Sequence, residues 1–84
     1  MRVMVVGGTH LGIVGFYGKK TFEVDSLDQI EAAIRNDHTI PPHGNKHLLH
    51  AKKSSYIAGS GRTIHTLVDK KGQTLFEYYV ESIL

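Results

Sequence analysis

Residues 26–36 read SLDQIEAAIRN, and this stretch decides the fold because it is the clearest helix signal in the chain. Ser26 followed by Gln29 is a capping box, in which the serine oxygen and the glutamine side chain satisfy orphan amides reciprocally. Asn36 suits the left-handed position at which a helix stops. The apolar residues recur at helical spacing and predict one narrow buried stripe, made of Leu27, Ile30, Ala33 and Ile34.

The chain on both sides of this helix predicts β-strands, because β-branched and aromatic residues gather in short runs between glycine-rich turns. Gly18 begins a predicted turn at residues 18–20, and Asp69 begins a type I turn with Gly72 at its bulge position. The expected strands are residues 1–8, 9–17, 21–24, 56–58, 62–69 and 73–81. We therefore expect an α+β fold, with an antiparallel β-sheet of about five or six strands and one α-helix, about residues 26–36, packed on one face.

The last predicted hairpin is apolar on both faces. Leu67 and Val68 point to opposite sides of their strand, and so do Leu75 and Phe76. A single helix covers only one side of such a strand pair, so the other side needs a second cover. We therefore predict a homodimer or a complex with a partner protein, with an interface formed by Leu67, Val68, Phe76, Tyr78 and Tyr79.

The composition limits the class of protein. A chain of 84 residues fits a single domain, residues 1–84. The absence of cysteine excludes a disulfide framework, a thiolate zinc site and a cysteine nucleophile. The longest apolar run stops at Gly7, well short of the roughly 20 residues that a membrane helix requires. We therefore expect a cytoplasmic protein without membrane contact and without a cofactor.

Basic residues are concentrated between residues 43 and 71, where Asp69 is the only acidic residue. Such a block predicts a face that attracts anions, although a merely solvated surface has the same composition. The turn at residues 59–62 adds backbone amides and the planar fork of Arg62, which suit a phosphate group. The predicted anion-binding residues are Lys46, Lys52, Lys53, Ser60, Arg62, Lys70 and Lys71.

Four of the six histidines fall in the same block and allow two further kinds of site. His43, His47 and His50 share one side of the chain if this segment is helical, and could then bind a metal ion. A metal-free nuclease site requires a base, an acid and a cation that stabilises the phosphorane. The candidates are His47, His50 and His65 as proton carriers, with Arg62 or Lys52 as the cation.

No spacing rule ties these histidines together, so the sequence favours binding over catalysis. The leading hypothesis is a small non-enzymatic binding or inhibitor-type protein that occupies a partner's surface. Its basic face, residues 46–71, would engage nucleic acid, a nucleotide or an acidic protein surface. The two alternatives are a histidine-dependent, metal-free nuclease and a small metal-binding regulator.

Overall fold

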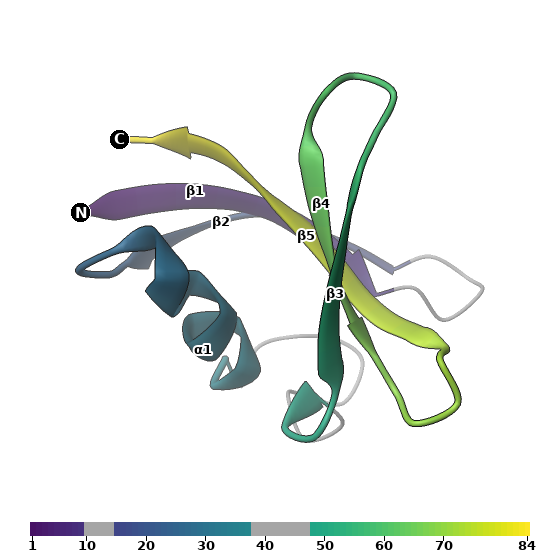
Figure 1. Cartoon of the computed structure of the whole chain (residues 1–84). Helices are drawn as coiled ribbons and strands as arrows, with labels where there is room; N and C mark the ends of the chain where they lie inside the picture. Colours follow the sequence, from purple (N-terminus) through teal and green to yellow (C-terminus); the bar gives the residue numbers. More distant parts are fainter. Residues whose placement is uncertain (10–14, 38–47) are drawn as a thin grey trace.

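The computed structural model describes residues 1–9, 15–37 and 48–84 (Figure 1). Within these ranges the strands form one antiparallel sheet in the order β2-β1-β5-β4-β3, accompanied by one short helix. The predicted α+β class is therefore confirmed. The elements are β1 (Arg2–Thr9), β2 (Gly15–Glu23), the 3₁₀ turn η1 (Leu27–Gln29), α1 (Ile30–Arg35), β3 (Lys52–Ile57), β4 (Thr63–Val68) and β5 (Thr74–Ile83).

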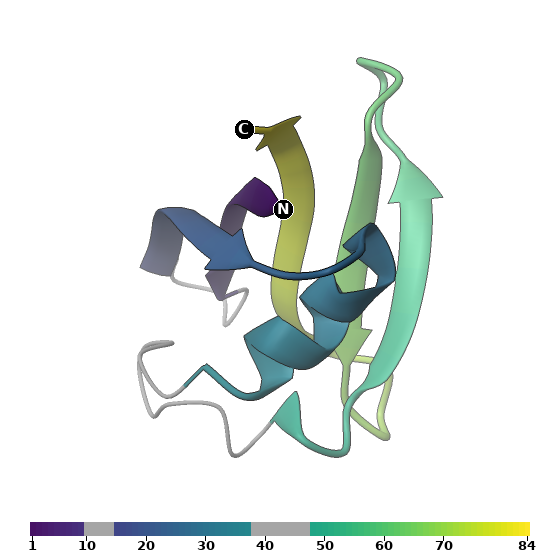
Figure 2. The same cartoon turned by 90° about the vertical axis from the view of Figure 1, so that its left-hand side faces the viewer.

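Strand β5 lies at the centre of the sheet and joins its two halves. Its last residues pair with β1, for example Val80 with Val5, and its first residues pair with β4, for example Phe76 with Leu67. The sheet is strongly twisted, so that β3 and β4 cross the direction of β1 and β2 (Figure 1). Figure 2 shows α1 in front of β5, with β2 on one side and β3 on the other.

One cluster of buried apolar residues joins the sheet and the helix. Residues that pair across antiparallel strands point to the same side of a sheet, so the register defines a core side. We call the opposite side the open side. The cluster contains Val3, Val5, Phe22, Val24, Ile30, Ile34, Leu48, Ala51, Leu67, Phe76 and Tyr78.

The end of α1 is fixed to the sheet and to the following segment by charged groups. Lys20 on β2 forms a 2.6 Å ion pair with Asp37, whose side chain is almost fully buried. Arg35 donates a 2.6 Å hydrogen bond to the backbone oxygen of Leu48. These contacts connect the helix to both neighbouring parts of the fold.

The helix forms where predicted, but its ends differ from the prediction. The Ser26 hydroxyl donates to the Asp28 carboxylate, which as a charged acceptor competes with the expected capping role. The Gln29 side chain accepts from the Asp25 amide instead, at 2.8 Å. The capping box is therefore wrong in detail, and Leu27 is 46% exposed rather than buried. The left-handed stop is also wrong, since Asn36 has a φ of −99°.

The predicted turn at residues 18–20 is wrong, because these residues belong to the continuous strand β2. Gly18 has a φ of +91°, and the register against β1 shifts from Gly7↔Gly18 to Gly8↔Phe16. The glycine therefore forms a bulge within one strand, where its positive φ is needed, and does not reverse the chain. The predicted hairpin between β4 and β5 is confirmed, with Gly72 at a φ of +82°.

Candidate anion-binding site

The predicted basic face is divided between the two ends of the β3–β4 hairpin. At one end Lys52 pairs with Val68, directly before the turn that holds Lys70 and Lys71. At the other end lies the turn with Ser60 and Arg62. Strand β4 separates the two ends by about 20 Å, at about 3.3 Å per residue. Lys46 lies outside the described residues.

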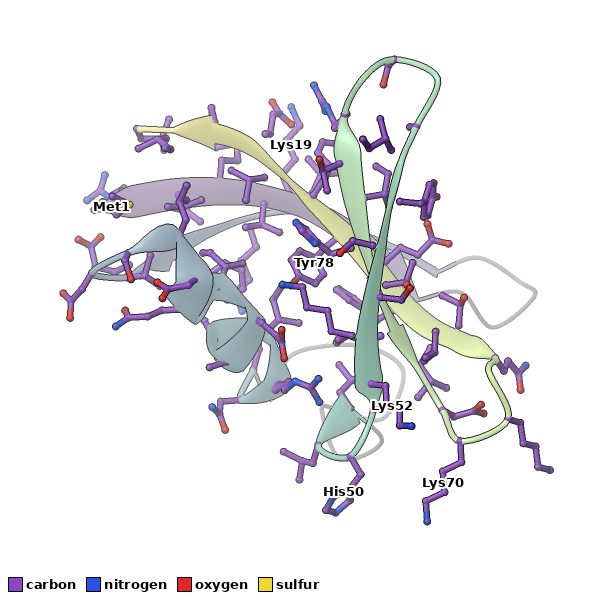
Figure 3. All side chains as sticks on the ribbon, in the orientation of Figure 1. Met1, Lys19, His50, Lys52, Lys70 and Tyr78 are labelled. Carbon is purple, nitrogen blue, oxygen red and sulfur yellow. The ribbon has the colours of Figure 1, made fainter. Side chains whose placement is uncertain are left out.

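The first of these ends brings together four exposed basic side chains, and we call it the basic end: His50, Lys52, Lys70 and Lys71. Figure 3 shows His50, Lys52 and Lys70 at the same end of the hairpin. All four side chains are exposed, and none forms an ion pair within the part of the chain that the structure describes. The basic end therefore presents concentrated positive charge to the solvent.

Asp69 is the acidic residue beside the basic end, and its carboxylate is engaged by the backbone of the turn. It accepts hydrogen bonds from the amides of Lys71 and Gln73, both at 2.9 Å. This arrangement fixes the conformation of the turn and directs the carboxylate to the backbone. The backbone that carries Lys70 and Lys71 therefore has a fixed conformation.

Lys53 does not join the basic end, although it follows Lys52 in the sequence. It pairs with Leu67 on the core side of the sheet, and its ammonium lies 3.5 Å from the Glu31 carboxylate of α1. Glu31 also forms a 3.0 Å ion pair with Arg35. Strand alternation therefore assigns the two adjacent lysines to opposite sides of the sheet.

Arg62 stacks on an aromatic ring of the open side. Its guanidinium carbon lies 4.2 Å from the centre of the Tyr79 ring, a cation–π geometry. A guanidinium stacked in this way keeps its N–H groups in its own plane, where they can still reach an anion. Ser60 is exposed in the same turn. These two residues form a second, smaller positive position, remote from the basic end.

His65 lies on the core side in the middle of β4. Its Nδ1 is 2.8 Å from the Ser55 hydroxyl, and its ring centre is 5.1 Å from that of Tyr78. Partial burial lowers the pKa of His65, and the nearby Lys53 lowers it further, so the neutral ring is favoured. Burial also raises the pKa of Tyr78 to about 12, which keeps the phenol neutral.

The residues of the nuclease hypothesis do not converge in the described structure. His50 lies at the basic end, His65 lies in the middle of β4, and Arg62 lies at the far turn. His47 is outside the described residues. The sequence grouped these residues by composition, whereas the extended strand keeps them apart.

The metal hypothesis falls largely on residues that the structure does not describe. His43 and His47 lie outside the described residues, and only His50 lies within them. Across residues 1–9, 15–37 and 48–84, no group of three His, Cys, Asp or Glu residues could hold a metal ion.

The predicted hairpin interface needs correction. Leu67, Phe76 and Tyr78 are 0%, 0% and 3% exposed, because they pack in the core of their own chain. They are therefore inaccessible to a second protein. Val68 and Tyr79 are partly buried on the open side. The homodimer itself stays a prediction.

Strand β3 is the structural feature that the sequence did not predict as a whole. It begins at Lys52, before the expected strand at residues 56–58, and every one of its residues is exposed. Its sequence KKSSYI has no apolar alternation, because an edge strand that projects from the core buries neither side. The density of β-branched and aromatic residues therefore gave no signal for its first half.

Comparison with protein-family models, curated proteins and solved structures finds no match to this chain. Among the helical segments of the described residues, none is long and apolar enough to cross a membrane.

Proposed function

We propose that this protein is a non-enzymatic binding protein whose basic end engages the phosphate groups of nucleic acid. The observation that carries the proposal is the basic end, where the exposed Lys52 pairs with Val68 directly before the turn that carries the exposed Lys70 and Lys71. None of these three lysines has an ion-pair partner in the described residues. The protein acts by occupying its partner's surface and performs no chemical step.

Lysines on a hairpin end suit contact with a phosphate backbone better than recognition of bases. Each ammonium is a point charge on a flexible stem, which accommodates phosphates at variable positions. Binding a phosphate releases condensed counterions, so each contact adds to affinity and to salt dependence. The proposal therefore predicts binding with little sequence preference and a strong response to salt.

The open side of the sheet is less suited to nucleic acid. Tyr56 donates a 3.2 Å hydrogen bond to Glu77, and Lys19 is paired with Glu81 at 3.0 Å. Carboxylates beside the aromatic rings repel phosphates, so bases are not expected to stack there. This contrast favours the basic end over the sheet surface.

The test is a salt series of binding to double-stranded DNA by the parent and two charge-matched variants. Replacing Lys70 and Lys71 by glutamine should lower the slope of log affinity against log salt by about two units. Replacing Lys19 and Lys53, which already form ion pairs, removes the same charge and should change the slope far less. Equal slopes for the two variants, or no binding by the parent at low salt, would refute the proposal.

A further inference from the structure

Strand β3 is an open edge of the sheet, and all six of its residues are exposed. It pairs with β4 through an unbroken register, without the bulge that interrupts the other edge strand, β2. Ile57 is 75% exposed, which is the highest value among the exposed large apolar residues of the described chain. A regular, exposed edge of this kind is a template for another strand.

The register shows which backbone groups face outward from this edge. The Ala58 amide donates to the Arg62 oxygen at 2.8 Å, so residues 58 and 62 form a hydrogen-bonded pair. Hydrogen-bonded and non-hydrogen-bonded pairs alternate along an antiparallel ladder. The residues that turn their N–H and C=O groups away from β4 are therefore Lys53, Ser55 and Ile57.

We infer that β3 pairs antiparallel with β3 of a second copy, about a two-fold axis that passes beside Ser55. In this register Ser55 faces Ser55 of the second copy, and Lys53 faces Ile57 of the second copy at both ends. All three outward-facing residues then form hydrogen-bonded pairs. The strand is self-complementary in this direction alone, as the positions of its charges make clear.

The distribution of charge along β3 favours a second copy of the chain as the partner and antiparallel pairing as its direction. Lys52 and Lys53 occupy the start of β3, while Tyr56 and Ile57 occupy its end. Antiparallel pairing sets the lysines of one copy beside the apolar end of the other, whereas parallel pairing sets like charges side by side. The aliphatic stem of Lys53 would then cover the exposed side chain of Ile57 of the second copy.

This interface differs from the hairpin interface expected from sequence and does not depend on nucleic-acid binding. It uses backbone groups and the exposed residues of β3, not the buried Leu67 or Phe76. Lys52 of the basic end belongs to β3, but Lys70 and Lys71, the residues replaced in the binding test, lie in the β4–β5 turn outside the pairing strand. The two inferences therefore fail separately.

The first experiment uses the absence of cysteine in the chain. Ser55→Cys, Ser54→Cys and Ser60→Cys each introduce one thiol at an exposed position. Residues in a hydrogen-bonded pair have Cα atoms about 5.5 Å apart, within reach of a disulfide. Ser55→Cys should therefore form a disulfide-linked dimer under mild oxidation, faster than Ser54→Cys or Ser60→Cys. Faster cross-linking of Ser54→Cys, or equal rates for all three, overturns the inference.

The second experiment measures the dimer without a covalent bond, by sedimentation equilibrium. Ile57→Lys places like charges opposite each other twice per dimer and should raise the dissociation constant roughly tenfold. Ile57→Glu faces Lys53 of the second copy and should lower the dissociation constant. Thermal melting of each monomer should be unchanged, because Ile57 contributes little to the core. A parent chain that stays monomeric up to about 1 mM, or the same constant for both variants, overturns the inference.

Discussion

The two sides of the sheet shield their apolar and aromatic side chains from water in different ways. On the core side, Val5, Leu67 and Phe76 pack with the helix residues in a closed apolar cluster. On the open side, two aromatic residues contact charged neighbours of the same chain: the Arg62 guanidinium lies over the Tyr79 ring, and the hydroxyl of the exposed Tyr56 donates to Glu77. An arginine side chain can therefore cover part of an aromatic ring on a strand face without a second layer of protein.

This difference changes how the apolar residues on both sides of the β4–β5 hairpin are interpreted. The sequence shows apolar residues on both sides of β4 and β5, and a missing second cover suggested a dimer at that surface. In the structure Tyr79 is only partly buried, yet the Arg62 guanidinium occupies one face of its ring. The contact with a second copy that we infer lies instead at the β3 edge, where the backbone groups of Lys53, Ser55 and Ile57 face outward.

The largest expected effect is on the core side of the comparison. Ile30 is 2% exposed in the cluster, so Ile30→Asp buries an unpaired charge and should cost about 4 kcal/mol or more. Leu27→Asp makes the same chemical change one turn earlier, at a residue that is 46% exposed. It should change the free energy of unfolding by about 0.5 kcal/mol or less. Urea denaturation measures both, and similar losses in the two variants would contradict the core assignment.

A second expected effect concerns the close approach of β1 and β5. A Cβ atom added at Gly7 would lie 2.9 Å from the Phe76 ring and 3.0 Å from the backbone oxygen of Glu77. Gly7→Ala should therefore destabilise the protein by about 1–3 kcal/mol through overpacking. Gly59→Ala is the matched control, because the new methyl group would meet nothing within 4 Å. Chemical denaturation showing equal stability for both variants would mean that β1 and β5 pack less closely than described.

The sequence predicted the fold class where several local signals agreed. Ile30 and Ile34 showed helical spacing, and the hairpin showed two apolar strands around a turn with Gly72. The sequence did not reveal the bulge at Gly18, because a glycine with positive φ serves equally in a turn and in a bulged strand. Only the pairing with β1 separates the two possibilities.

The candidate site was predicted in composition but not in arrangement. The cluster of lysines is evident from the sequence, while the opposite directions of Lys52 and Lys53 depend on the strand that contains them. That strand gave no apolar pattern. The stacking of Arg62 on Tyr79 joins the β3–β4 turn to β5 and depends on the sheet order β5-β4-β3, which local patterns do not encode.

A smaller expected effect concerns His65 on the core side, whose protonation makes the stability of the protein depend on pH. The pKa of His65 is lowered from its ordinary value of 6.5 by partial burial and by Lys53, while Glu31 opposes this shift. The unfolded chain then binds the proton more readily than the folded chain, so stability falls as pH drops through about 6.5 and levels off below the folded pKa. Melting temperatures of the parent and His65→Gln between pH 7.5 and 5 measure this effect. The loss on acidification should be smaller in the variant, and identical pH profiles would refute the assignment.

The smallest expected effect tests how the open side is covered. If Arg62 stacks on Tyr79, a double-mutant cycle with Arg62→Gln and Tyr79→Leu should give a coupling energy of about 0.5–1 kcal/mol. Lys19 and Glu81, also on the open side, form an ion pair that is exposed to solvent and supplies the comparison cycle, with Lys19→Gln and Glu81→Gln. Its coupling of about 0.2–1 kcal/mol should fall in high salt, because mobile ions screen exposed charges. The coupling of Arg62 to Tyr79 should fall less, since ring contact excludes water and ions from one face of the guanidinium. Absence of coupling between Arg62 and Tyr79 would leave the ring uncovered and restore the open side of the hairpin as a surface that requires a second protein.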